Sequence, residues 1–177
     1  MAARGEDIHG EAAFVTGLVD PPARVLDAGC GTGRIAVRLD ELGYAVVGAD
    51  VDEAMLEVAR AEAPGLDWRQ ADLASFELGE RFDVVLLAGN IVPLLEPGTL
   101  AAVAGRLAAH VAPGGAVVCG FGLDAAHLPP GCPVTPLAEL ERAMTAAGLA
   151  LRDRYAGWDG APYDASGGYV VSVHAPA

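Results

Sequence analysis

The stretch Val25-Leu26-Asp27-Ala28-Gly29-Cys30-Gly31-Thr32-Gly33-Arg34 decides the fold of this chain of 177 residues. Two apolar residues are followed by a carboxylate, and glycines then occupy three alternate positions before an amphipathic segment begins. This order predicts a buried β-strand, a tight turn and the N-terminus of a helix. Glycine is required in such a turn where the backbone adopts a positive φ, or where a ligand approaches the main chain with no Cβ in the way.

Extended and helical patterns alternate along the rest of the chain. Segments typical of buried strands lie at 24–27, 44–50, 66–71, 82–87 and 116–121. The amphipathic segments between them predict a parallel sheet with helices on both faces. Two further extended segments, 149–155 and 169–174, are joined without a helix and are therefore expected to pair antiparallel.

The predicted architecture is an α/β three-layer sandwich. Its centre is a doubly wound, mostly parallel sheet of seven strands with an antiparallel last strand. The sequence contains no internal repeat and no linker, so we expect one domain over residues 1–177. A short helix at about 9–19 precedes the core, which spans residues 23–177.

Composition and charge argue against several classes of protein. The chain has 11 basic and 24 acidic residues, which give a formal net charge of −13. Proteins that bind nucleic acid neutralise its phosphates with Lys and Arg, so we expect no nucleic-acid partner. The N-terminal residues lack the apolar core of a signal peptide, and the longest apolar region, 84–95, is too short to cross a membrane. Three cysteines without metal-ligand spacing predict no metal site and a cytoplasmic location.

The quoted stretch closely resembles motif I of the class I S-adenosylmethionine-dependent methyltransferases, an acidic residue followed by GxGxG. The dinucleotide fingerprint GxGxxG differs, because it requires glycine at the position of Arg34. The resemblance extends from about His9 to His174. It implies the Rossmann-like methyltransferase fold, S-adenosylmethionine as cofactor, S-adenosylhomocysteine as product, and a small-molecule methyl acceptor.

The resemblance also implies which residues bind the cofactor, since ligands of such sheets lie beyond the carboxyl ends of the strands. Asp50 is expected to accept hydrogen bonds from the ribose hydroxyls, while Asp52 is expected to cap the next helix. Asp72 is expected to meet the adenine amino group, and Leu73 to pack on the ring. Cys30 is expected to point to the core and is not proposed as a nucleophile. The full predicted set is Asp27, Gly29, Cys30, Gly31, Gly33, Asp50, Val51, Asp72, Leu73, Ala88 and Gly89.

The acceptor side is less specified, and two readings stay open for each candidate. Asn90 either faces the substrate or caps the following helix, and Ala88-Gly89-Asn90 departs from the Asn-Pro-Pro-aromatic motif of enzymes that methylate nucleic acid bases. Trp158 and Tyr163 either wall a substrate pocket or pack on the edge of the sheet. His9 is either a general base or a solvated histidine at a helix start. His110 is expected at the surface.

The sequence therefore predicts a methyltransferase that acts on a small molecule, with the acceptor atom unassigned. Two alternatives remain: a non-catalytic subunit that binds S-adenosylmethionine, and an NAD(P)-dependent oxidoreductase, which the missing third glycine of the fingerprint opposes. Few residues precede the first predicted helix. The substrate pocket is therefore expected to be open, to be covered by a second copy in a homodimer, or to be completed by a longer N-terminus.

Overall fold

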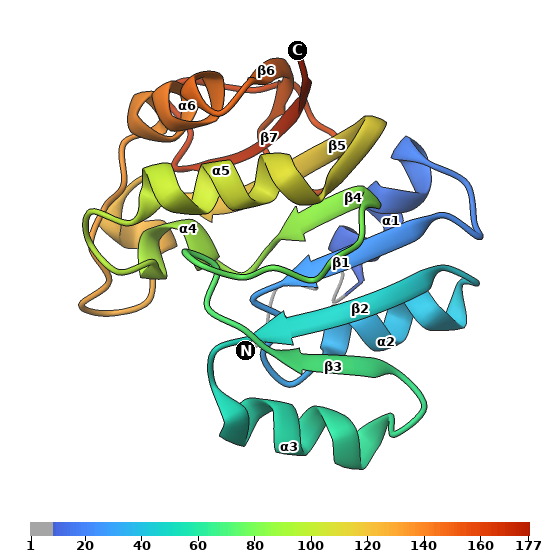
Figure 1. The fold of residues 1–177 in the computed structure, drawn as a ribbon. Helices are drawn as coiled ribbons and strands as arrows, with labels where there is room; N and C mark the ends of the chain where they lie inside the picture. The colour runs from blue at the N-terminus through green and yellow to red at the C-terminus, as the bar shows by residue number, and fades with distance from the viewer. Residues whose placement is uncertain (1–8) are drawn as a thin grey trace, which may run out of the picture.

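A seven-stranded sheet forms the middle layer of the computed structural model, which describes residues 9–177 (Figure 1). The strands lie in the order β3-β2-β1-β4-β5-β7-β6. β1 to β5 are parallel, and β7 is antiparallel to both β5 and β6. The predicted α/β fold with an antiparallel last strand is thus confirmed. The strands are β1 (Arg24–Ala28), β2 (Ala45–Asp50), β3 (Asp67–Gln70), β4 (Phe82–Leu87), β5 (Val111–Gly122), β6 (Leu149–Tyr155) and β7 (Tyr169–Pro176).

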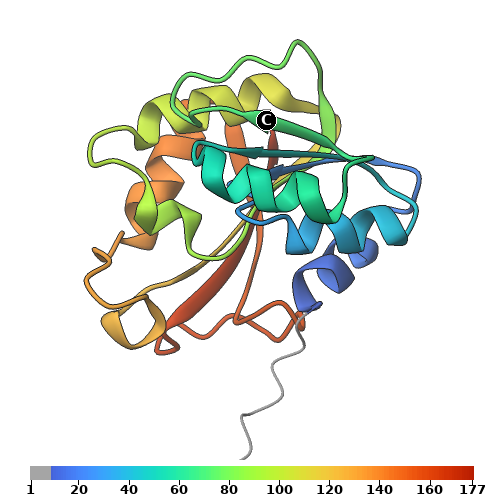
Figure 2. The same ribbon diagram turned by 90° about the horizontal axis from the view of Figure 1, so that it is seen from below.

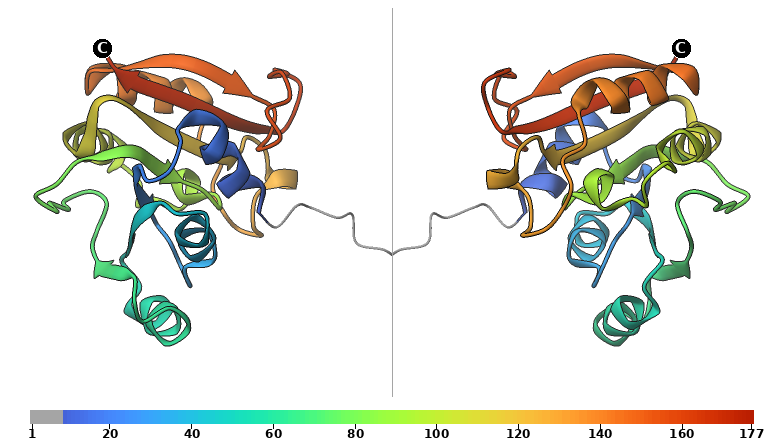
Figure 3. Two further views of the ribbon diagram at one scale, coloured as in Figure 1. Left: turned by 90° about the vertical axis from the view of Figure 1, so that its right-hand side faces the viewer. Right: turned by 90° about the vertical axis from the view of Figure 1, so that its left-hand side faces the viewer.

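Helices cover both faces of the sheet because successive strand residues point to opposite sides. Val25 packs with α1 (Gly10–Leu18), α2 (Arg34–Glu41) and α3 (Glu53–Glu62), and Figure 2 shows these three helices in a row. Leu26 packs on the other face with α5 (Leu100–His110) and α6 (Leu137–Ala146). In the edge-on views of Figure 3, α5 lies on one side of the sheet and α1 and α2 lie on the other. Within residues 9–177, no helix has the length and apolar character needed to cross a membrane.

Three elements differ from the predicted ones. A one-turn helix, α4 (Ile91–Leu94), follows β4, and a short 3-10 helix, η1 (Ala125–His127), follows β5. β5 begins at Val111, directly after α5, because Val111 pairs with Phe82 before the register shifts. Gly114, with φ +76°, lies in this irregular part, which forms a bulge at the start of the strand.

The crossover from β3 to β4, residues 71–81, contains no helix. Phe76 instead covers this part of the sheet, and its ring stacks on the His110 imidazole with 4.2 Å between centroids. The Leu78 N–H donates to His110 Nε2 (3.0 Å), so Nδ1 carries the proton that is donated to the Arg106 carbonyl (2.7 Å). The expectation that His110 lies at the surface is wrong. It is only 1% exposed, because both ring nitrogens have backbone partners.

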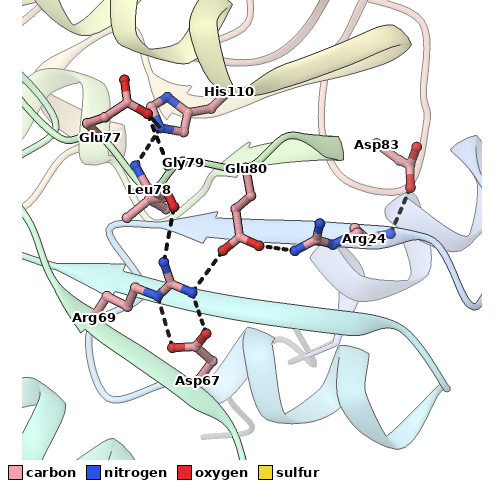
Figure 4. A network of polar contacts seen from close by, with 9 residues as sticks. All are labelled: Arg24, Asp67, Arg69, Glu77, Leu78, Gly79, Glu80, Asp83 and His110. Carbon is pink, nitrogen blue, oxygen red and sulfur yellow. Dashed lines mark hydrogen bonds and ion pairs between the residues drawn. The ribbon is translucent and has the colours of Figure 1, made fainter.

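Charged side chains fasten the end of this crossover to the sheet (Figure 4). Glu80 pairs with Arg24 of β1 and with Arg69 of β3, the latter at 2.8 Å. Arg69 also donates two hydrogen bonds to Asp67, at 3.0 and 2.7 Å. Apolar packing and ion pairs together allow an irregular segment to cover β1 to β3 in place of a helix.

We predict that Phe76→Ala lowers the free energy of unfolding by about 3–5 kcal/mol, the range for truncating a buried aromatic side chain. Glu77→Gln is the matched control, because the neighbouring Glu77 side chain is 63% exposed and its loss is worth at most about 0.5 kcal/mol. Urea denaturation of both variants measures the difference. A cost below about 1 kcal/mol for Phe76→Ala would show that the crossover is not a packed layer.

Candidate functional site

A cavity of about 710 Å³ opens at the carboxyl ends of β1, β2, β3 and β4. Its size lies within the range of about 300–1,000 Å³ that is typical of small-molecule sites. The strand order reverses between β1 and β4, which is the place where doubly wound sheets bind ligands. Ten residues of the predicted cofactor set line this cavity: Asp27, Gly29, Cys30, Gly31, Asp50, Val51, Asp72, Leu73, Ala88 and Gly89.

The three glycines of the turn after β1 have three different roles. All have a positive φ, +84° at Gly29, +55° at Gly31 and +87° at Gly33. A Cβ on Gly31 would meet no atom within 4 Å, so this residue leaves open space in the cavity. A Cβ on Gly29 would lie 2.6 Å from Cδ1 of Ile91, and one on Gly33 would lie 2.4 Å from the Trp68 ring. Gly33 is not among the residues that line the cavity, and its lack of a Cβ makes room for the Trp68 ring between α2 and β3.

Asp50 joins the first turn to the second. Its Oδ2 accepts a hydrogen bond from the Gly31 N–H (2.8 Å), and its Oδ1 accepts one from the Asp52 N–H (2.9 Å). Each carboxylate oxygen has a second lone pair, so Asp50 retains acceptor capacity toward a ligand. Asp52 caps α3 as predicted, because its Oδ1 accepts from the N–H groups of Ala54 (2.9 Å) and Met55 (3.4 Å).

Asp27, at the end of β1, is a buried carboxyl group in the wall of the cavity. It is 1% exposed, and its Oδ2 has no hydrogen-bond partner among residues 9–177. Burial raises the pKa of Asp27 to about 7, although the Ala36 N–H and the charge of Arg34 act in the opposite direction. An unpartnered buried carboxyl group is costly for the fold alone, so its presence here points to a ligand.

Asp72, Leu73 and Cys30 are further predicted cofactor residues that line the cavity. Leu73 is buried beside Asp72, whose Oδ1 accepts from the Ala74 N–H (2.8 Å). Cys30 is half-buried, and burial raises the pKa of its thiol far above neutrality, so it stays protonated and is a poor nucleophile. In the part of the chain that the structure describes, no group of three or more His, Cys, Asp and Glu side chains is arranged to hold a metal ion.

Sequence reasoning missed the part of the cavity wall that α4 and the start of α2 provide. Ile91, Leu94 and Leu95 line the cavity, and Leu94 is 57% exposed. An apolar run directly after a strand end was the available signal for these residues. Arg34 also lines the cavity and forms an ion pair with Glu11 of α1, with 2.8 Å between Nη2 and Oε1.

Trp158 and Tyr163 lie on opposite faces of the sheet, so the interpretation that they wall one pocket is wrong. Trp158 packs with the side of α1 to α3, lies against Gly120, and donates from Nε1 to the Tyr169 hydroxyl (3.0 Å). Tyr163 packs with the side of α5 and α6, and the Arg154 guanidinium carbon lies 5.7 Å from its ring centre. Both residues pack on the sheet, the alternative considered for them.

Asn90 and His9 also lie outside the cavity wall. Asn90 has φ +63° at the N-cap position of α4, but its side chain makes no capping hydrogen bond. Its Oδ1 instead accepts from the Gly122 N–H (2.7 Å), which ties the ends of β4 and β5 together. His9 occupies the N-cap position of α1. The Asn90 side chain therefore does not cap α4, and its role toward a substrate stays a prediction.

Comparison with known proteins identifies relatives of the chain. A family model described as a methyltransferase domain matches residues 25–115. The dTDP-4-amino-2,3,4,6-tetradeoxy-D-glucose N,N-dimethyltransferase of Saccharopolyspora spinosa is 35% identical over 122 residues, which cover 66% of this chain and 49% of that protein. A ubiquinone biosynthesis O-methyltransferase of Chelativorans is 34% identical over 154 residues, 74% of this chain and 60% of that protein. The chain spans about half the length of several curated relatives.

Solved structures share the fold over almost the whole chain. A TehB-like SAM-dependent methyltransferase from Corynebacterium glutamicum superposes with a TM-score of 0.88 at 28% identity, covering 98% of this chain and 90% of that one. The methyltransferase CcbJ from Streptomyces caelestis superposes with a TM-score of 0.84 at 25% identity, covering 97% and 90%.

We predict that Gly33→Ala destabilises the protein by about 1–3 kcal/mol, because the new Cβ meets both an unfavourable φ and the Trp68 ring. Gly98→Ala is the matched control, since its φ of +84° is close to that of Gly33 and its new Cβ would meet no atom within 4 Å. Thermal and urea unfolding of both variants gives the comparison. If both variants lose the same free energy of unfolding, the contact with Trp68 is not the reason that position 33 requires glycine.

Proposed function

Because the chain belongs to the methyltransferase-domain family, we propose that it transfers a methyl group from S-adenosylmethionine to a small-molecule acceptor. The observation that carries the proposal is the cavity itself, in which Asp27, Gly31 and Asp50 meet at the switch in strand order. Gly31 leaves space for a ligand against the backbone, and the unpartnered Asp27 Oδ2 offers a buried acceptor to a cationic group.

The residues of the cavity fit the parts of this cofactor. Asp50 would accept hydrogen bonds from the ribose hydroxyls, Asp72 would accept from the adenine amino group, and Leu73 would support the adenine ring. Val51, Ile91 and Leu94 supply apolar surface around the same region. Asp27 lies at the turn where the methionine end would lie, and its carboxyl suits the ammonium group there.

The charge of the cavity favours this cofactor over a dinucleotide. Among residues 9–177, five acidic side chains line it and Arg34 is the one cationic side chain, which is already paired with Glu11. A pyrophosphate carries negative charge and would lie against these carboxylates, whereas S-adenosylmethionine carries a net positive charge. This electrostatic argument disfavours the oxidoreductase alternative. The acidic residues are Asp27, Asp50, Asp52, Asp72 and Glu96.

When bound, S-adenosylmethionine supplies a methyl group that its sulfonium makes electrophilic, so the chain has to position rather than activate it. The turn after β1 and the carboxylate of Asp50 hold the donor side in place, while Leu73, Ala88 and Ile91 exclude water from the same cavity. Neither His9 nor Asn90 lines the cavity, so neither is proposed as a general base.

The acceptor is proposed to be a small metabolite with a nitrogen or oxygen nucleophile. Relatives are named for N-methylation of amino sugars and for O-methylation in ubiquinone biosynthesis. The net charge of −13 opposes a polyanionic acceptor. The three cysteines form no disulfide, in keeping with a cytoplasmic location, and a homodimer remains a prediction of the sequence.

We predict that the protein binds S-adenosylhomocysteine with micromolar or better affinity and does not bind NAD. Asp50→Ala should weaken this binding by about 1–3 kcal/mol, the range for hydrogen bonds to a charged group. Asp52→Ala is the control, because Asp52 caps α3 and its loss should affect stability more than affinity. Isothermal titration calorimetry measures all three proteins. Binding of NAD alone, or unchanged affinity in a folded Asp50→Ala variant, contradicts the assignment.

We further predict that the methyl group enters a small-metabolite fraction and not nucleic acid. The protein is incubated with a radiolabelled methyl donor and either total nucleic acid or a protein-free metabolite extract. The control is Gly31→Val, whose branched side chain strains a φ of +55° and fills the cavity. Label in nucleic acid that this variant abolishes would contradict the proposal, and label in neither fraction would favour a non-catalytic binding subunit.

A further inference from the structure

The Asp27 carboxyl group is buried in a setting that does not fully balance a negative charge. It lies at the end of β1 in the cavity wall, is 1% exposed, and leaves Oδ2 without a hydrogen-bond partner among residues 9–177. A carboxylate in this position has lost its water without gaining a full set of donors. Such groups tend to hold a proton until a cation arrives.

The charged groups around Asp27 come from three elements. Arg34, the first residue of α2, attracts negative charge at Asp27, but its guanidinium is shared with Glu11 of α1 at 2.8 Å. Glu11 and Asp50 of β2 both repel a charge on Asp27, and the nearby Cys30 thiol is neutral. The N–H of Ala36 is the backbone group that favours the charged form. Burial outweighs the Ala36 N–H and the charge of Arg34, which both favour the ionised carboxylate, and it raises the pKa of Asp27 to about 7.

We propose that Asp27 holds a proton in the ligand-free protein and releases it to solvent when the ammonium group of a ligand enters the cavity, so that cofactor binding is coupled to proton release. The proposal rests on the proposed function, which supplies a ligand with an ammonium group. The charge balance is simple: one proton leaves the carboxyl group, and the resulting carboxylate faces one cationic amine.

The coupling has a defined pH dependence. Below the pKa of Asp27 the ligand has to displace a proton, so its affinity should rise about tenfold for each pH unit. Above that pKa the carboxyl group is already ionised, and the affinity should level off. S-adenosylmethionine and S-adenosylhomocysteine both carry the ammonium group and should behave alike. 5′-Methylthioadenosine has the same adenosine part but no amino-acid end, so its affinity should not show this dependence.

The test is calorimetry of S-adenosylhomocysteine binding at pH 6 and pH 8 in buffers with different ionisation enthalpies, which counts the protons released. We expect nearly one proton released at pH 6 and few at pH 8 for the natural protein. We expect none for 5′-methylthioadenosine, and none for S-adenosylhomocysteine binding to Asp27→Asn. Asp52→Asn is the matched control, because it alters an acid of the same cavity that does not act on the Asp27 carboxyl group, and asparagine can still cap α3, so the release should be retained.

Binding of S-adenosylhomocysteine at pH 6 without proton release, or release that persists in Asp27→Asn, would overturn the proposal. If neither ligand binds, the proposed function fails, and the proton on Asp27 is tested without ligand. A folded-state pKa above the unfolded value means that the native state binds more protons between about pH 4 and pH 7. The stability of the natural protein relative to Asp27→Asn should therefore fall as pH rises through this window. If the difference in unfolding free energy between the natural protein and Asp27→Asn does not change with pH in this window, the proposal is overturned without any ligand measurement.

Discussion

The hydrogen bond from the Gly31 N–H to Oδ2 of Asp50 is the interaction on which the site depends. It joins the turn after β1 to the end of β2, where the N–H groups of Gly29 and Cys30 also donate to the Ala49 carbonyl at 2.8 and 3.0 Å. Oδ1 of the same carboxylate accepts from the Asp52 N–H, and Asp52 in turn caps α3. The Asp50 side chain thus links the turn before α2 to the turn before α3 at the wall of the cavity.

Two features of the site would be absent from a protein optimised for stability alone. Asp27 is buried without a full set of partners, and Gly31 leaves space that a side chain would fill. Both features cost stability in the ligand-free protein, and both suit a ligand with a cationic end and a close approach to the backbone. Elsewhere in the sheet most buried side chains are apolar, with Ser172 and His174 of β7 as buried polar exceptions, and Phe76 with His110 closes the crossover that lacks a helix.

The sequence predicted those aspects of the fold that depend on local patterns. Apolar runs located the strands, and glycine positions located the turn that lines the cavity. Roles that depend on distant partners were not predictable in this way. Gly33 is explained only by Trp68, 35 positions later in the chain. The burial of His110 depends on Leu78 of the crossover, whose N–H donates to the imidazole ring. Trp158 and Tyr163 lie in the same loop between β6 and β7, yet they pack against the core clusters of two different faces.

A crystal structure of the protein with S-adenosylhomocysteine tests the central claim most directly. The account predicts ligand density along the carboxyl ends of β1 to β4, with the ribose at Asp50, the adenine ring between Val51 and Leu73, and the amine at Asp27. Density elsewhere on the protein, or an adenosine group bound in this cavity without a contact to Asp50, would contradict it.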